Sequence, residues 1–105
     1  MSKILEEKYP LIYYFLNSYL EVHLLEGDEK GRSMSIQQIV DLFKSHNNNE
    51  IENSLIEEIE KIRNNKKDLE LIKSLHIYQL GYETEPQNML AEIDKSFKIK
   101  LAKRG

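Results

Sequence analysis

The side chains that could hold a metal or catalyse a reaction are three histidines and several neighbouring carboxylates. His23, His46 and His76 lie far apart in the sequence, on three different predicted helices. A metal site needs several converging ligands, and the chain contains neither a His-x-x-x-His nor a Glu-x-x-His spacing. We therefore expect each histidine to be a surface or helix-end residue, and we predict no metal site.

Nucleophilic catalysis and phosphate binding also lack their usual motifs. No serine lies in a Gly-x-Ser-x-Gly turn, and Gly27 and Gly31 are not followed by the Lys-Ser/Thr of a phosphate-binding loop. Paired carboxylates occur at Glu57-Glu58 and in the segment 83–85. Carboxylates on a charged helix face or in a loop are usually solvated, and they gain an acid–base role only in a site that shifts their pKa. We predict that the chain is not an enzyme and needs no cofactor.

Two surface features combine residue types that favour the binding of another protein. An acidic segment ends the first predicted helix and contains Glu21, Glu26, Asp28 and Glu29. A second segment places aromatic residues beside carboxylates, at Tyr78, Tyr82, Glu83 and Glu85. Tyrosine is common at interfaces because it buries a large area and keeps a polar tip. The two tyrosines are equally well explained by packing at the edge of the core, with their hydroxyls in water.

The distribution of charge favours a basic partner. The formal net charge is −3, from 15 Lys and Arg against 18 Asp and Glu. The last ten residues carry +4, from Lys98, Lys100, Lys103 and Arg104, so the first 95 residues carry −7. An acidic body disfavours nucleic-acid binding and speeds encounter with a basic protein. Moderate negative charge also keeps a protein soluble, and this simpler explanation stays open.

Length and composition indicate one soluble domain over residues 1–105. The chain has no cysteine, which excludes disulfides and is typical of a reducing compartment. The N-terminus does not follow the pattern of a secretory signal. The longest apolar run is six residues, at 11–16, whereas roughly 20 are needed to span a bilayer. We expect a cytoplasmic protein that does not bind membranes.

The candidate residues must be positioned by helices. The sequence YPLIYYFLNSYLEVHLL, residues 9–25, predicts a first helix that begins at Pro10, and the chain breaks at the charged loop EGDEKGRS. This helix is apolar on nearly all sides, as expected of a helix in the middle of a bundle. Four further segments have apolar residues at i, i+3, i+4 and i+7 or similar spacings, the mark of one-sided helices.

Helix-capping patterns divide these four segments. Ser35 with Gln38 predicts a capping box for the second helix, and Asn49 and Asp68 are the expected caps of the third and fourth. Gly81 is expected to end the fourth helix, and Pro86 to begin the fifth. The predicted fold class is therefore all-α, a compact bundle of about five main helices around a buried N-terminal helix.

The order of motifs matches a known pattern over roughly residues 8 to 101. Tyr9-Pro10, Phe15-Leu16 and Tyr19-Leu20 are followed by an acidic Gly-Asp loop and a Glu-rich helix with a Leu/Ile stripe. Leu80-Gly81-Tyr82, a proline at 86 and a closing amphipathic helix come later. This order resembles a family of small all-helical immunity proteins from bacterial contact-dependent growth inhibition systems. The chain lacks the Asp and Trp that many members carry after the position of Tyr19.

Members of that family are cytoplasmic proteins that bind the toxic C-terminal domain of a matching surface effector. The resemblance implies that this chain neutralises such a toxin domain, a basic nuclease with RNase activity favoured, as a monomer that forms a 1:1 heterodimer. Its acidic surface would cover the toxin's active site. The alternative is a small helical adaptor or regulatory subunit that binds an endogenous cytoplasmic protein.

Overall fold

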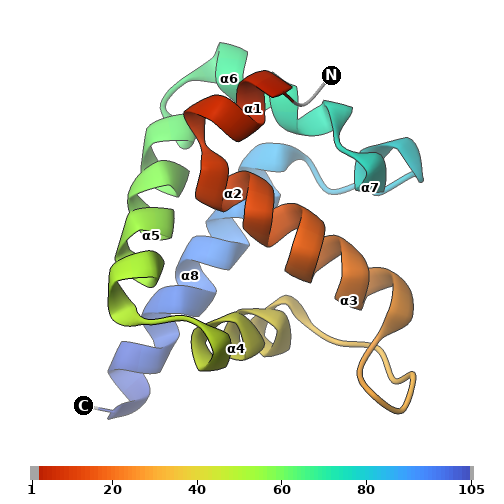
Figure 1. The fold of residues 1–105 in the computed structure, drawn as a ribbon, viewed down its shortest axis with the longest axis vertical. Coiled ribbons are helices and arrows are strands. Elements are labelled where there is room, and N and C mark those ends of the chain that lie inside the picture. Colours follow the sequence, from red (N-terminus) through yellow and green to blue (C-terminus); the bar gives the residue numbers. More distant parts are fainter. Residues whose placement is uncertain (1–2, 105) are drawn as a thin grey trace.

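The computed structural model describes residues 3–104, and the side chains of residues 3–98, as a bundle of helices without a β-strand (Figure 1). The predicted all-α fold class is confirmed. In chain order the elements are α1 (Lys3–Lys8), α2 (Pro10–Phe15), the π-helix η1 (Leu16–Leu20), α3 (Glu21–Glu26), α4 (Ile36–His46), α5 (Asn49–Arg63), α6 (Lys66–Leu71), the 3-10 turn η2 (Ile72–Ser74), α7 (His76–Gln79) and α8 (Pro86–Arg104).

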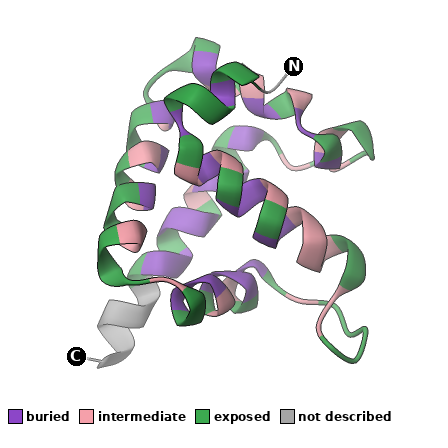
Figure 2. Cartoon of the chain, in the orientation of Figure 1, coloured by how far each residue is buried: buried purple, intermediate pink, exposed green. Residues whose placement is uncertain are grey.

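The first predicted helix corresponds to α2, η1 and α3, which follow one another without a break. Its start at Pro10 and its end close to Leu25 are as expected, but it is buried along one face rather than on all sides (Figure 2). The α3 turn has no buried residue, and Leu25 is 56% exposed. The outward face nearer the start carries Tyr13 and Tyr14, whose hydroxyls can stay hydrated while their rings cover the core.

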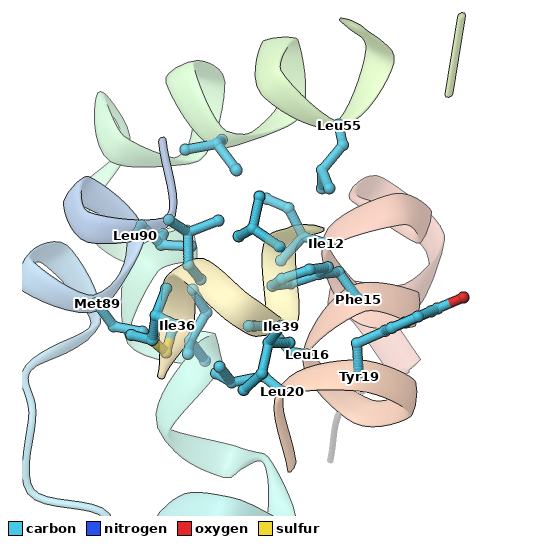
Figure 3. Packing of buried hydrophobic residues seen from close by; sticks show 14 of the residues in the cluster. Ile12, Phe15, Leu16, Tyr19, Leu20, Ile36, Ile39, Leu55, Met89 and Leu90 are labelled. Atoms are coloured by element: carbon cyan, nitrogen blue, oxygen red, sulfur yellow. The ribbon is translucent and has the colours of Figure 1, made fainter. Parts of the chain in front are cut away.

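The buried face of this helix forms the centre of one hydrophobic core, to which α4, α5 and α8 also contribute (Figure 3). Phe15 and Tyr19 both pack edge-on against Phe43 of α4, with ring centroids 5.2 Å and 5.0 Å apart. Phe97 of α8 packs against Phe43 at 6.0 Å. Edge-to-face pairs of this kind add to the stabilisation from burial alone. The N-terminal helix therefore organises the core, as the sequence predicts.

The capping box predicted for α4 is present. The backbone N–H of Gln38 donates to Ser35 Oγ over 3.1 Å, and the backbone N–H of Ser35 donates to Gln38 Oε1 over 2.8 Å. The predicted cap of α5 is wrong by one residue, because Asn48 rather than Asn49 accepts the N–H of Ile51, over 2.9 Å. The helix begins one residue earlier than its apolar stripe indicates.

The predicted cap of the fourth helix is also wrong. Asn65 caps α6 by accepting the N–H of Asp68, over 3.1 Å. Asp68 itself is buried, where it accepts hydrogen bonds from Tyr9 Oη over 2.6 Å and from Lys8 Nζ over 2.8 Å. Asp68 therefore ties α1 and the start of α2 to α6, a contact between residues about sixty positions apart that spacing rules cannot reveal.

The fourth predicted helix is interrupted. After α6 and η2 the backbone becomes extended at Leu75, with ψ of 152°, and the short helix α7 then begins at His76. This break lets both Leu75 and Ile77 point into the core, where they are 2% and 4% exposed. Gly81 follows α7 and Pro86 begins α8, both as predicted.

The closing helix α8 packs against α4 and α5. Its predicted inner face is buried at Leu90, Ile93 and Phe97. Lys98 pairs with Asp94 over 3.0 Å. The side chains of the other three basic residues of the tail, and that of Leu101, lie outside the described residues.

Candidate partner-binding site

The two surface features of the sequence meet between α3 and α7, on the right of Figure 1. Glu21, the first residue of α3, places Oε2 3.2 Å from Nδ1 of His76, the first residue of α7. The contact becomes an ion pair when His76 is protonated. The other carboxylate oxygen of Glu21, Oε1, is buried and has no hydrogen-bond partner among the described residues. Glu21 therefore joins the two elements and keeps one acceptor unused.

An apolar groove, which we call the α3–α7 groove, lies beside this link. Its volume is about 310 Å³, and its lining residues are Leu24, Leu25, Ile77, Leu80, Gly81 and Tyr82. Leu25 and Leu80 are 56% and 53% exposed, among the most exposed large apolar side chains described. Neither leucine was predicted from the sequence to contact a partner. The available signals were an apolar pair, Leu24-Leu25, at the very end of a helix and an apolar residue directly before a helix-ending glycine.

Four carboxylates belong to the elements that form the groove, and we call them the acidic rim: Glu21, Glu26, Glu83 and Glu85. Neither α3 nor the segment 76–85 contains a lysine or arginine. Glu85 Oε1 is 3.5 Å from Nζ of Lys73, the middle residue of η2. Glu26 and Glu83 are exposed and make no ion pair within the described part of the chain. The rim is therefore a site of net negative charge.

The two predicted tyrosines are in contact, with ring centroids 5.3 Å apart and an interplanar angle of 78°. The hydroxyl of Tyr78 donates to the backbone carbonyl of Thr84 over 2.7 Å, and burial raises its pKa well above the usual value. Tyr78 therefore packs at the edge of the core and closes the segment that leads to α8, but its hydroxyl is bonded rather than free in water. Tyr82 lines the groove. Only Tyr82 of this pair is placed to meet a partner.

Asp28 holds its own loop together. Its Oδ1 accepts the backbone N–H groups of Lys30 and Arg32, over 2.8 Å and 2.9 Å, and its Oδ2 accepts from Arg32 Nε over 2.8 Å. The backbone hydrogen bond from Arg32 is the main cause that lowers the pKa of the Asp28 carboxyl. The carboxylate is thus neutralised within the loop, unlike Glu26 and Glu83.

Asp28 and Glu29 line a different hollow, on the α4 side of α3. Its volume is about 430 Å³, and its lining residues are His23, Asp28, Glu29, Lys30, Arg32, Met34, Leu42 and His46. His23 Nδ1 lies 3.2 Å from the carbonyl of Gly27, and His46 Nδ1 lies 3.1 Å from the hydroxyl of Tyr19. The two histidines thus line one hollow, but no three His, Cys, Asp or Glu side chains among the described residues are grouped to hold a metal ion.

The eight predicted residues therefore divide into three groups. Glu26, Tyr82 and Glu83 lie on or beside the α3–α7 groove and are available to a partner, while Glu21 joins α3 to α7 beside it. Tyr78 and Glu85 support the same segment through bonds to Thr84 and Lys73. Asp28 and Glu29 lie at the other hollow.

The comparisons with known proteins do not place this chain in a family. Comparisons with family models, with curated proteins and with solved structures give no match. No helix in the described part of the chain has both the length and the apolar character needed to cross a bilayer. The features available for assigning a function are therefore the groove, its acidic rim and the motif order of the sequence.

Proposed function

We propose that this chain is an immunity protein that binds and neutralises the toxic C-terminal domain of a contact-dependent growth inhibition effector. The proposed toxin is a basic nuclease, with RNA as the favoured substrate. The protein acts in the cytoplasm as a monomer and forms a 1:1 complex with the toxin. It does so by binding alone, without a catalytic step or a cofactor.

The observation that carries this proposal is the acidic rim around an apolar groove. A nuclease must hold phosphates, so its active-site cleft is rich in lysine and arginine. Carboxylates presented together attract such a cleft and take the place of substrate phosphates. Glu26 and Glu83 make no ion pair with any described residue, and Tyr82 beside them offers aromatic area. In this proposal the rim enters or covers the cleft and excludes RNA.

Growth rescue tests the proposal. The gene directly upstream is expected to encode a large effector, and expression of its C-terminal domain alone should stop growth. Co-expression of this chain should restore growth, and the two proteins should copurify. Toxin-domain expression that is neither rescued nor bound by this chain would contradict the proposal.

Two charge-reversed double variants test whether the acidic rim is the surface that binds the toxin. Glu26→Lys/Glu83→Lys removes the unpaired carboxylates of the rim, whereas Glu50→Lys/Glu57→Lys makes the same change in net charge on the exposed face of α5. We expect the first pair to reduce rescue and the second to retain it. In the alternative function, as an adaptor for an endogenous protein, the chain would copurify with a host protein from cells that carry no toxin.

A further inference from the structure

The α3–α7 groove exposes apolar surface that the fold does not use. Leu25 projects from the end of α3 and Leu80 from the end of α7, each more than half exposed, while Ile77 at 4% exposure belongs to the core. The groove volume of about 310 Å³ is at the lower end of the range of ligand pockets, about 300–1,000 Å³. Exposed apolar surface with a polar rim is typical of interaction sites, where one or two anchor side chains supply most of the affinity.

The negative charge of the rim determines which kind of protein segment can bind in the groove. Helix α3 and the segment 76–85, which form the groove, contain four carboxylates and no lysine or arginine. An acidic segment would be repelled, and two copies of this chain that met groove to groove would bring eight carboxylates together. A segment with lysine or arginine on either side of an apolar residue satisfies both the groove and its rim.

Glu21 links the two sides of the groove. It lies three and four residues before Leu24 and Leu25, so all three share one face of α3. Its Oε1 is buried without a hydrogen-bond partner among the described residues. Because Oε1 is inaccessible to solvent and Oε2 contacts His76, Glu21 holds α3 and α7 together, and the carboxylates of the rim that a partner can reach are Glu26 and Glu83.

We propose that the α3–α7 groove is the anchor site for a basic protein segment, in which an apolar side chain enters between Leu25 and Leu80 while flanking lysine or arginine side chains contact Glu26 and Glu83. The identity of the partner as the toxin domain rests on the proposed function, whereas the chemistry of the segment rests on the groove alone. Affinity then comes mainly from the leucines, and the acidic rim mainly sets the speed of encounter.

The first test uses two synthetic peptides with the same apolar positions, one with lysine and one with glutamate at every polar position. Amide NMR of isotope-labelled protein reports where each peptide binds. We expect the lysine peptide to shift the amide signals of residues 21–26 and 76–83, and the glutamate peptide to shift none of them. Leu25→Ser/Leu80→Ser should weaken the binding of the lysine peptide at least tenfold. Because both leucines are exposed, this variant should fold normally.

The second test measures the dissociation constant for the upstream toxin domain. Leu25→Ser/Leu80→Ser should raise it at least tenfold, mainly through faster dissociation. The matched control is Ile4→Ser on α1, a side chain 53% exposed that lies outside the groove, and it should leave the constant unchanged.

A lysine peptide that shifts neither segment, together with toxin binding unaffected by the two leucines, would overturn the inference while leaving the proposed function intact. A toxin domain that does not bind, with a lysine peptide that does, would support the groove and overturn the proposed function.

Discussion

At the scale of single residues, Asp68 is a buried polar group that joins separate elements of the fold. Its side chain is only 10% exposed and joins α6 to Lys8 and Tyr9. A buried carboxylate is stable only when donors replace the water it loses, and these two side chains provide them. Burial, followed by the hydrogen bond to Asp68, raises the pKa of Tyr9 to about 12.

Tyr9→Phe removes one of these donors and leaves the ring in place. The hydrogen bond is 2.6 Å long, and its acceptor is charged. We expect the free energy of unfolding to fall by about 1.5–3 kcal/mol, measured by urea denaturation. Tyr14→Phe is the control, because Tyr14 is 41% exposed and its hydroxyl is 3.4 Å from that of Tyr19. Equal effects from the two variants would show that the Asp68 contact does not stabilise the fold.

The Asp68 carboxylate should make the stability of the fold depend on pH. The hydrogen bond from Lys8, followed by that from Tyr9, lowers the pKa of Asp68 in the folded state. The stabilisation is therefore complete above the unfolded-state value of about 3.9 and is lost as the pH falls through the lower folded-state pKa. The stability difference between the wild type and Asp68→Asn, measured by urea denaturation, should shrink as the pH is lowered from 7 toward 3. A difference that is constant with pH would contradict this.

Glu58 should show the opposite slope. Its Oε1 accepts the N–H groups of Leu11 and Ile12, over 3.0 Å and 3.1 Å, and so caps α2 from a neighbouring helix. Burial nevertheless raises the pKa of Glu58, because it outweighs these bonds. Its carboxylate therefore contributes less as the pH rises from the unfolded-state value through the folded-state pKa.

The corresponding variants separate the cap from the charge. Glu58→Gln keeps an acceptor, and its stability relative to the wild type should improve as the pH rises through this range. Glu58→Ala loses the cap and should cost about 1 kcal/mol at neutral pH, a typical value for a lost N-cap. Both are measured by chemical denaturation at several pH values. An alanine variant as stable as the glutamine variant would exclude the capping role.

At the scale of elements, the loop after α3 requires glycine at one position for two separate reasons. Gly27 has φ of +77°, and a Cβ there would collide with the backbone carbonyl of Arg32. Gly31 has nearly the same φ, +78°, but open space around it. Gly31→Ala should cost about 1–2 kcal/mol from conformation alone, whereas Gly27→Ala should cost more because the loop must also open. Thermal unfolding of both variants distinguishes these costs, and equal values would contradict the collision.

Sequence patterns were reliable for elements whose signals are local. The capping box at Ser35, the start of a helix at Pro10 and the start of another at Pro86 all depend on neighbouring residues, and all three are confirmed. The interruption at Leu75 has no glycine or proline to mark it. It exists because the core accepts both Leu75 and Ile77, a condition set by distant helices.

The π-helix η1 was likewise not predictable, and it matters for the site. A π turn contains one more residue than an α turn, so it rotates everything after it by about 100° relative to a regular helix. The α3 turn that follows has no buried residue, and Leu25 lies exposed. The prediction of a helix buried on nearly all sides included Leu25, so the groove could not be seen from the sequence. The acidic rim could be predicted, because the charge of a segment can be read from its sequence without knowledge of its geometry.

At the scale of the whole molecule, the acidic body and the placement of its unpaired carboxylates support one surface for binding. The first 95 residues carry −7, but many of these charges are bonded within the fold, at Asp28, Glu58, Asp68 and Asp94. Within the described residues Glu26 and Glu83 make no such bond, and both belong to the segments that form the groove. Complementary charge acts mainly on the rate of encounter, so kinetics reports on the rim more directly than affinity does.

Binding of a basic toxin through the acidic rim is tested most directly by the association rate constant with the upstream toxin domain, measured by stopped flow at several salt concentrations. For the wild type we expect fast association that slows steeply with salt. Glu26→Lys/Glu83→Lys should slow association about tenfold at low salt, and Glu50→Lys/Glu57→Lys, with the same net charge, should slow it much less. Equal slowing by the two pairs, or no association at all, would contradict the assignment of this surface.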